Sequence, residues 1–593
     1  MNIPLSCRVG LGLVFLTFIL VLLGVFHLYT PSVLMIVWLV WLAASPVGLF
    51  QVRREPFFTE SFPHGDPSWN PLFLRICLGV TLLMYLIFTM TPETRHDPYD
   101  YHLTIPALYL AHQSIVEIPW HVFSYMPKNC EILYGLALGV GNDSLTKLFH
   151  FLFGCLSVLS VASFMKRTAD HEASMLAGLL VVTLPVFGFL ATLSYIDLGR
   201  AFWELSALYM LAHAWHETPD KTRRYSFLLS ALFAGMALGT KYVSFLVFFP
   251  PYLLLAALTL WKRIVDRRLC LTLFGTLCIL APLSPWLIYN AVWTGNPVYP
   301  LLSSLFGMNI PPAQAAYDFI RGHAPQMETF TWPAFPGYIL SRINGLLLDG
   351  NALFLIGLIA LATTPWWRRQ SIGRSLPAFA RRGFVFYIVA STILFLAGSD
   401  NMDGRFFVST LMLLAAPVVF FLYAVSSTIH QTSPWGRYVI PGFALVLFAN
   451  SATYRFNQMK ALDESPMPIL TDSQRDQWLS RRFRYYEATQ WANHNLPADA
   501  TVLGMGYPLR LKFIAKIKYG YIPFLHDLNS ETSLEDLAKR LYQNDVLYIV
   551  KPFITLDPPF DLSLLNPDYM KSIYSYRGIE IFKLRLPDRY ESE

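Results

Sequence analysis

Charged residues are scarce in this sequence. Asp, Glu, Lys and Arg make up 14% of its 593 residues, and the mean hydropathy is +0.42. A typical soluble domain carries about 25% charged residues. With 54% hydrophobic residues, this composition excludes an ordinary soluble globular protein and predicts a polytopic membrane protein.

Cysteine patterns, repeats and low-complexity tracts are also missing. The chain has six cysteines, five of them within or beside apolar runs and only Cys130 in a loop predicted to lie outside. No CxxC motif occurs, so neither a disulfide framework nor a cysteine metal site is predicted. The net charge of +6 reflects a bias between loops and does not indicate a nucleic-acid surface.

Long apolar runs are what the sequence does contain. About 20 mostly apolar residues span a bilayer, and about thirteen stretches come close to that length. They lie near 9–28, 32–50, 71–90, 146–165, 173–191, 200–216, 226–240, 243–261, 270–289, 347–365, 384–398, 406–425 and 438–453.

Basic residues alternate between the connecting loops, which predicts the orientation of the chain. Short cytoplasmic loops carry the excess of Lys and Arg. Those loops contain Arg53 and Arg54, Lys166 and Arg167, Lys221 to Arg224, Lys262 to Arg268, Arg368 to Arg382, and Arg437. We therefore expect the other loops and the C-terminal tail on the extracytoplasmic side of what is expected to be a bacterial inner or plasma membrane.

Two outer loops and a change in composition define the expected organisation. The loops at 91–145 and 290–346 are too long for simple connectors, and Ile115–Val122 is predicted to form an interfacial amphipathic segment. From about residue 456 strand and helix patterns alternate. The predicted fold is an all-α membrane domain over 1–455, followed by a small extracytoplasmic α/β domain over 456–593.

The segment Arg95–Tyr109, with the sequence RHDPYDYHLTIPALY, concentrates polar chemistry at the end of an apolar run. It contains Asp97, Asp100, Tyr101 and His102. Ionisable residues at a membrane boundary are costly to place and therefore indicate function. Other outer loops add three such residues, which are Asp197, Lys241 and Arg405.

These residue types suit sugar transfer from a phosphate-linked donor. Such a reaction needs a base for the acceptor hydroxyl, cations for the departing phosphate and a cleft for the lipid tail. Asp97 could act as the base, and Lys241 and Arg405 could neutralise phosphate oxygens. Structural roles stay open: Asp97 could pair with Arg95, and Asp197 with Arg200. Arg405 could pair with Asp400 or Asp403, while Lys241 could reach the headgroups.

The order of these features resembles the GT-C class of glycosyltransferases, in the branch of protein O-mannosyltransferases and aminoarabinose transferases. In that class an Asp in the first large outer loop begins a D-x-x-x-Y pattern, often D-E-x-x-Y. Here Asp97 and Tyr101 keep the pattern, but Pro98 replaces the second acid. Two spans precede this loop, whereas the simplest GT-C arrangement has one.

The resemblance also covers later motifs and implies roles for them. YIDLGRAF matches the second acidic site at Asp197, GTKY contains Lys241, and GRF contains Arg405. The implied catalytic residues are Asp97 and Asp197, and the implied substrate-binding residues are Lys241, Arg405, Tyr101, His102 and Asp100. The implied reaction inverts the configuration at the anomeric carbon of the sugar.

The implied partners are a polyprenyl-phosphate sugar donor, membrane lipids, and a lipid, glycan or protein acceptor. No nucleic acid is expected. The carboxylates could bind Mg²⁺ or Mn²⁺, but no ligand spacing demands a metal site. Pro98 argues against a pair of metal-binding carboxylates at 97 and 98.

Two other functions fit a membrane protein of this kind. A flippase or transporter of a lipid-linked glycan would place polar residues at mid-membrane and have repeated halves, whereas the charges here gather at one outer rim. A glycan ligase or polymerase using diphosphate-linked donors would need more cations around the donor.

Overall fold

A computed structural model describes most of the helical region and the core of the C-terminal sheet. The described residues are 3–50, 71–93, 95, 97–118, 122–169, 171–216, 220–264, 267–306, 343–344, 346, 353–365, 378–397, 403–461, 468–482, 486–497, 500–504, 517–519, 534–543, 546–552 and 569–585.

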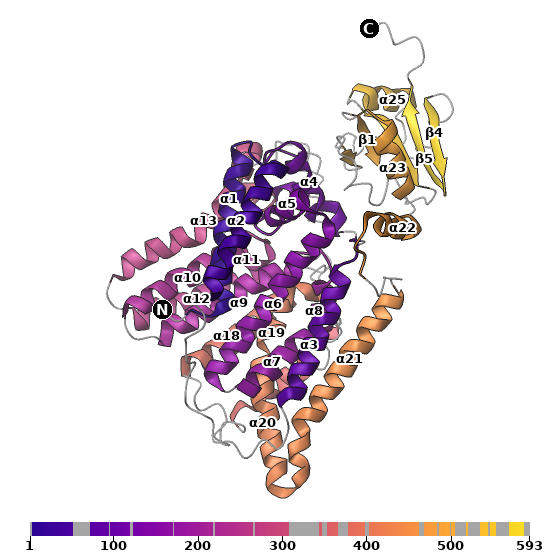
Figure 1. The fold of residues 1–593 in the computed structure, drawn as a ribbon. Coiled ribbons are helices and arrows are strands. Elements are labelled where there is room, and N and C mark those ends of the chain that lie inside the picture. Colours follow the sequence, from indigo (N-terminus) through magenta and orange to yellow (C-terminus); the bar gives the residue numbers. More distant parts are fainter. Residues whose placement is uncertain are drawn as a thin grey trace, which may run out of the picture.

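Helices make up the first part of the chain (Figure 1). They are α1 (Leu5–Val25), α2 (Pro31–Phe50), α3 (Pro71–Thr89), the π-helix η2 (Pro98–His102), α4 (Thr104–Ala111), the 3₁₀-helix η3 (Val122–Tyr125), α5 (Glu131–Val140), α6 (Asp143–Thr168), α7 (His171–Val182), α8 (Pro185–Ala191), α9 (Asp197–His216), α10 (Asp220–Leu238), α11 (Val243–Val247), α12 (Phe249–Arg263), α13 (Arg268–Thr294), α14 (Ser303–Phe306), α18 (Ala378–Leu396), the 3₁₀-helix η6 (Gly404–Phe407), α19 (Val408–Leu413), α20 (Ala415–Thr432), the 3₁₀-helix η7 (Pro434–Tyr438) and α21 (Val439–Ala461).

Helix α9 forms the centre of this helical region. All but two of its 20 residues are buried, and it packs against α6, α10, α12 and α19. A helix that is buried all round needs partners on every side, and these four helices provide them. The residues of α9 are therefore held by an almost fully enclosed helix.

Two membrane-crossing stretches are bent. Helices α7 and α8 meet at 72°, and η6–α19 meets α20 at 47°. Pro185 opens α8, and because proline has no N–H to donate, the helix of α7 cannot continue through it. By length and composition, four described helices can cross a membrane, or six if each bent pair counts as one span. The chain is thus a multi-pass membrane protein, and the figure of about thirteen spans stays a prediction.

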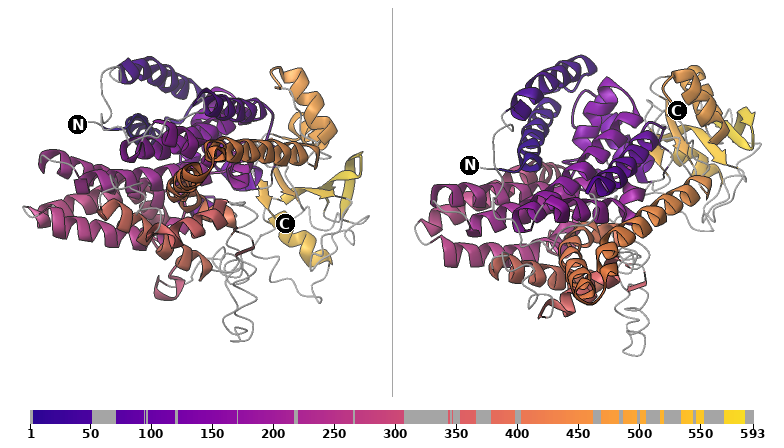
Figure 2. Two further views of the ribbon diagram at one scale, coloured as in Figure 1. Left: turned by 90° about the horizontal axis from the view of Figure 1, so that it is seen from below. Right: turned by 60° about the horizontal axis from the view of Figure 1, so that its bottom comes forward.

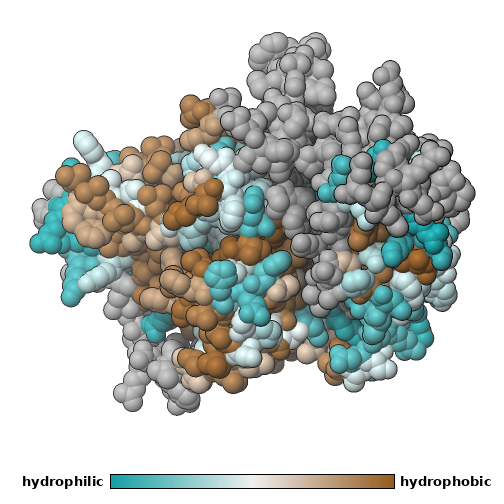
Figure 3. Space-filling view, turned by 90° about the horizontal axis from the view of Figure 1, so that it is seen from above, coloured by the Kyte–Doolittle hydropathy of each residue, from teal (hydrophilic) through white to brown (hydrophobic). Residues whose placement is uncertain are grey.

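Basic residues lie at both ends of α10. Arg223 and Arg224 lie in the first turn of α10, where Arg223 also donates to the carbonyl of Arg263 (3.0 Å) at the end of α12. Lys241 follows the other end of α10. In the space-filling view, apolar side chains cover the middle of the face and hydrophilic ones gather toward its edges (Figure 3).

The C-terminal part contains one mixed sheet. Its elements are α22 (Asp472–Arg482), α23 (Tyr486–Asn495), β1 (Thr501–Gly504), β2 (Ile517–Tyr519), α25 (Leu534–Gln543), β3 (Val546–Pro552), β4 (Met570–Tyr576) and β5 (Ile579–Leu584). The strand order is β2-β1-β3-β5-β4. β1 pairs in parallel with β2 and β3, whereas β5 runs antiparallel to β3 and β4.

The sheet lies beyond the helix ends, near α4 and α5 (Figures 1 and 2). Two contacts tie the C-terminal part to the helices: the amide of Ile469 donates to the carbonyl of Met90 (2.9 Å), and the guanidinium of Arg475 on α22 pairs with Asp143 at the start of α6. This part is therefore anchored at the end of the helical region that carries the first outer loop.

Several sequence expectations are corrected or stay untested. Residues 115–118 form no helix. The amide of Ile115 instead donates to the carbonyl of Gly24 (3.0 Å), which holds this segment at the end of α1. The amphipathic pattern over 471–496 predicts one helix, whereas the structure has two, α22 and α23. The division at 455/456 stays a prediction, and most of the loop at 290–346 lies outside the described residues.

Candidate active site

A short π-helix carries the first predicted site residue. Asp97 is the N-cap of η2, and Pro98 opens the helix, where the missing N–H of proline is not needed. The hydroxyl of Tyr99 donates to the carbonyl of Glu93 (2.6 Å) and so closes the loop behind it. Such π-helical turns are frequent at functional sites. Here the turn holds Asp97 at the start of a short helix whose preceding loop is closed by the Tyr99 hydrogen bond.

Asp97 pairs with a residue more than 300 positions away. Its Oδ2 lies 2.9 Å from Nη1 of Arg405, and Nε of Arg405 lies 3.1 Å from Oδ2 of Asp403. The Asp97 side chain is 25% exposed and that of Arg405 15%, so the pair stands at the edge of the buried region. Its ionic attraction is screened less than that of a surface pair.

Asp197 and Lys241 form a second ion pair. Nζ of Lys241 donates to Oδ1 of Asp197 (3.0 Å). Asp197 begins α9, where a negative charge is favoured by the helix dipole. Among the described residues, Oδ2 of Asp197 is buried without a hydrogen-bond partner, so one oxygen of this carboxylate can still accept a hydrogen bond.

The start of α9 is held by a histidine. Nδ1 of His150 lies 2.9 Å and 2.8 Å from the carbonyls of Leu190 and Leu193, and Nε2 accepts from the amide of Leu198 (3.0 Å). Because two carbonyls face Nδ1, that nitrogen carries the proton and Nε2 is the acceptor. His150 thus fixes the backbone next to Asp197.

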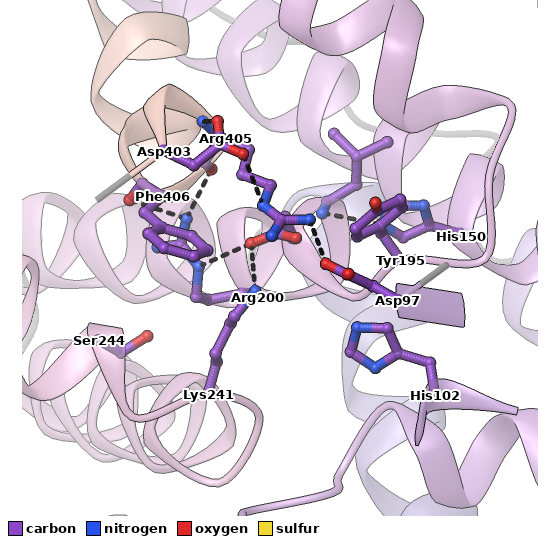
Figure 4. Close-up of polar contacts among 12 residues, drawn as sticks. Asp97, His102, His150, Tyr195, Arg200, Lys241, Ser244, Asp403, Arg405 and Phe406 are labelled. Atoms are coloured by element: carbon purple, nitrogen blue, oxygen red, sulfur yellow. Dashed lines mark hydrogen bonds and ion pairs between the residues drawn. The ribbon is translucent and has the colours of Figure 1, made fainter. Parts of the chain in front are cut away.

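The two ion pairs meet around an aromatic side chain (Figure 4). Nζ of Lys241 lies 4.4 Å from the ring centre of Phe406, the residue after Arg405. The guanidinium of Arg405 also lies 4.7 Å from the ring centre of Tyr195. Four segments, around 97, 197, 241 and 405, thereby place two carboxylates and two cations in one cluster.

The charge of Lys241 depends on its partner. Lys241 lies in the turn between α10 and α11, and burial lowers its pKa because an ammonium is costly to desolvate. The carboxylate of Asp197 opposes this shift, while Arg405 adds to it, and the net pKa is lowered. Asp197 is therefore the group that keeps Lys241 protonated.

The other predicted residues lie on η2 beside Asp97. The ring of Tyr101 stacks on Phe123 with centres 4.1 Å apart, and burial raises its pKa. His102 is fully buried with Nδ1 2.9 Å from Oε1 of Glu131. Asp100 is largely buried. The structure thus places Tyr101, His102 and Asp100 on the same short helix, with His102 paired to α5.

Two of the structural pairings that the sequence left open, Arg405 with Asp403 and Asp197 with Arg200, are present in the structure and do not exclude a functional role. Arg405 pairs with Asp97 as well as Asp403, and the guanidinium of Arg95 lies over the ring of Phe189 at 5.4 Å. Nε of Arg200 is 4.0 Å from Oδ1 of Asp197, farther than Nζ of Lys241.

Sequence reasoning missed several polar residues around the cluster. Glu204, His150, Ser244 and Ser409 all lie within apolar stretches and are buried. For His150 and Glu204, the rarity of ionisable residues inside membrane spans was the available signal. The two serines carried no signal, because serine is common in membrane helices. Within the described ranges, no group of three or more His, Cys, Asp or Glu residues is arranged to hold a metal ion.

Comparison with known proteins identifies the fold. Residues 132–289 match the family model of dolichyl-phosphate-mannose-protein mannosyltransferases. The crystal structure of ArnT from Cupriavidus metallidurans bound to undecaprenyl phosphate superposes with a TM-score of 0.57, covering 87% of this chain and 98% of that chain at 14% identity. The chain has the fold of ArnT. The GT-C resemblance predicted from the sequence is thereby confirmed.

ArnT in the apo state gives a similar result, with a TM-score of 0.54 and 13% identity over 86% of this chain and 97% of that chain. Among curated proteins, none is similar enough in sequence to be matched. The family match runs from α5 to α13 and includes Asp197 and Lys241. The ArnT fold extends the likeness over most of the chain.

Proposed function

We propose that this protein is an inverting glycosyltransferase that moves a sugar from a polyprenyl-phosphate donor to an acceptor hydroxyl at the extracytoplasmic membrane surface. The observation that carries the proposal is the 2.9 Å contact between Asp97 and Arg405 beside the 3.0 Å contact between Asp197 and Lys241. One cluster then holds both a base for the acceptor and cations for a phosphate.

The donor phosphate is the natural competitor for both cations. Charge-assisted bonds from Arg and Lys to phosphate are short and strong, and the partners of Arg405 and Lys241 are carboxylates with less charge than a phosphate leaving group. When the phosphate draws Arg405 away, Asp97 loses the guanidinium that stabilises its ionised form. Donor binding therefore makes Asp97 a better base at the moment when a base is needed.

The chemical step balances without a further reactant. Asp97 takes the proton of the acceptor hydroxyl, and the acceptor oxygen bonds to the anomeric carbon. The bond between that carbon and the phosphate oxygen breaks, and its electron pair stays on the phosphate. Lys241 and Arg405 neutralise the charge that develops there, a contribution worth about 10²–10³ in rate for one well-placed donor in comparable sites.

The fold supports the choice of lipid and side. ArnT with this fold is found bound to undecaprenyl phosphate, and the cluster lies at the end of α10 opposite Arg223 and Arg224. By the positive-inside rule, the cluster faces the extracytoplasmic side. Tyr101, His102 and Asp100 stand next to Asp97 on η2, where they would contact the sugar or the acceptor.

A proteoliposome assay tests the proposal against transport. The purified chain is reconstituted with a panel of polyprenyl-phosphate sugars and a membrane extract that supplies acceptors. The proposal predicts that one donor is consumed and an equal amount of polyprenyl phosphate is released. Movement of intact donor between leaflets without release would instead identify a flippase.

A further inference from the structure

A buried carboxylate lies two turns along α9 from Asp197. Glu204 is fully buried in α9, a helix enclosed by other helices, where an ionised side chain is costly unless its oxygens are hydrogen-bonded. Among the described residues, the hydrogen bonds of its carboxylate go to Arg200, Ser244 and Ser409, and not to Asp97, Lys241 or Arg405. Glu204 therefore needs an explanation of its own.

Both oxygens of Glu204 accept hydrogen bonds, and the donors come from three elements. Oε1 accepts from Nη1 of Arg200 on α9 (2.7 Å) and from the hydroxyl of Ser244 on α11 (2.8 Å). Oε2 accepts from the hydroxyl of Ser409 on α19 (2.5 Å). One carboxylate thus links α9, α11 and α19.

The two serines follow the two cations closely in sequence. Ser244 comes three residues after Lys241, and its amide donates to the carbonyl of Lys241 (3.1 Å). Ser409 comes four residues after Arg405, at the start of α19. Each serine therefore connects the segment that carries one of the cations to the carboxylate of Glu204.

Arg200 adds a second link to the Arg405 segment. Its Nη2 donates to the carbonyls of Arg405 (3.2 Å) and Phe406 (3.0 Å), while its Nη1 is held by Glu204. The ring of Phe406 in turn lies under Nζ of Lys241. Arg200 and Glu204 together hold the backbone on which Arg405 stands.

We propose that Glu204 and Arg200 are positioning residues that set the spacing between Lys241 and Arg405, and hence the width of the phosphate site. The inference rests on the proposed function, since it assigns these cations to a phosphate. If Glu204 only neutralised the charge of Arg200, its contact with Arg200 would be enough. The hydrogen bonds of Glu204 to the two serines, and those of Arg200 to the two backbone carbonyls, are additional contacts that hold neighbouring segments in position.

The test measures lipid-phosphate binding by the purified full-length chain in detergent. The probes are a short-chain polyprenyl phosphate and the neutral polyprenol of the same length. The test variant combines Ser244→Ala and Ser409→Ala, which removes both links while leaving the Glu204 and Arg200 pair in place. The matched control is Ser226→Ala. This variant removes a 2.9 Å contact between Ser226 on α10 and His213, which lies on α9 as Glu204 does.

The double serine variant is expected to bind polyprenyl phosphate about tenfold more weakly. Each lost hydrogen bond to the charged Glu204 weakens the hold on one of the segments that carry Lys241 and Arg405. The affinity of this variant for the polyprenol should match that of the control. Its melting temperature should fall below that of the control, because Oε2 of Glu204 loses its donor, but the loss of affinity should be confined to the phosphate. Glu204→Ala should weaken phosphate binding further.

Three other outcomes overturn the inference. If the double serine variant binds polyprenyl phosphate as the control does, while Lys241→Ala loses binding, positioning is wrong and the phosphate site stands. If Lys241→Ala and Arg405→Ala both bind normally, the phosphate site and the inference fail together. If the double variant loses affinity for both lipids together with its melting temperature, Glu204 supports the fold only.

Discussion

At the residue scale, the central feature is the proposed base, Asp97, held by an arginine. An arginine next to a carboxylate favours the ionised form but lowers its readiness to take a proton. Asp97 in contact with Arg405 is therefore a poor base until another anion engages the guanidinium. In the proposed reaction, this arrangement would couple donor binding to activation of the acceptor.

The pH dependence of activity should report Lys241. Its pKa is lowered by burial and supported by Asp197, so the charge is present at low pH and is lost as the pH rises through the lowered pKa. Activity should fall on the alkaline side for this reason. Lys241→Arg should abolish that fall, because arginine stays protonated, and Asp197→Asn should move it to lower pH. Steady-state rates across pH measure both effects. An alkaline limb that is the same in all three proteins would contradict the assignment.

The sequence alone could identify four of the clustered residues, for a physical reason. Asp97, Asp197, Lys241 and Arg405 are ionisable residues at the ends of apolar runs, where they are rare and costly. Their pairing could not be predicted, because more than 40 positions separate any two of these residues, and only the fold brings them together. Ser244 and Ser409 could not be found, since their importance lies in the carboxylate that they share.

At the element scale, close helix packing depends on glycine at one contact. A Cβ added to Gly235 on α10 would lie 2.3 Å from the carbonyl oxygen of Ile279 on α13. Gly235→Ala should therefore push the two helices apart and destabilise the protein by about 1–3 kcal/mol. A melting curve in detergent checks this. The control is Gly79→Ala, where nothing lies within 4 Å of the added atom. Equal melting temperatures for the two variants would refute the packing argument.

The link between α22 and α6 should steady the loop that carries Asp97. Arg475 pairs with Asp143, whose Oδ2 accepts from the amide of Glu93 (3.0 Å). Arg475→Ala removes a largely buried charge-assisted bond, which costs about 1.5–3 kcal/mol. We expect faster hydrogen exchange over 97–104 and a several-fold loss of activity.

The matched control for this link is Arg481→Ala, an exposed position on the same helix. Exchange over 97–104 should not change in that variant. If Arg475→Ala leaves exchange and activity at the level of the control, the C-terminal part does not influence the loop.

The strands show where sequence reasoning reaches its limit at this scale. The runs TVLG, VLYIV and IEIFKL predict strands from the sequence, and they form β1, β3 and β5. β4 was missed because its sequence, MKSIYSY, has no apolar run, and it is a strand because it pairs with β5 across a turn at Arg577 and Gly578. Both turn residues have positive φ, as a two-residue hairpin of this kind requires.

At the scale of the whole molecule, the proposed function implies one orientation of the chain across the membrane. The cluster and the sheet should lie outside, and the turn between α20 and α21 should lie inside. A membrane-impermeant maleimide added to right-side-out vesicles should label Ser572→Cys on β4 and leave Thr432→Cys unlabelled until the membrane is opened. Both positions are exposed. Labelling of Thr432→Cys alone in sealed vesicles would reverse the proposed orientation.

The most direct test of the account is sugar transfer by Asp97→Asn. Asparagine keeps the size of the side chain but cannot take the acceptor's proton, so the transfer rate should fall by about 10²–10⁴, while the protein inserts and melts normally. Asp220→Asn, which alters an exposed ion pair with Arg223 and Arg224 at the other end of the helices, should keep the wild-type rate. Wild-type transfer by Asp97→Asn would contradict the central claim that Asp97 is the base.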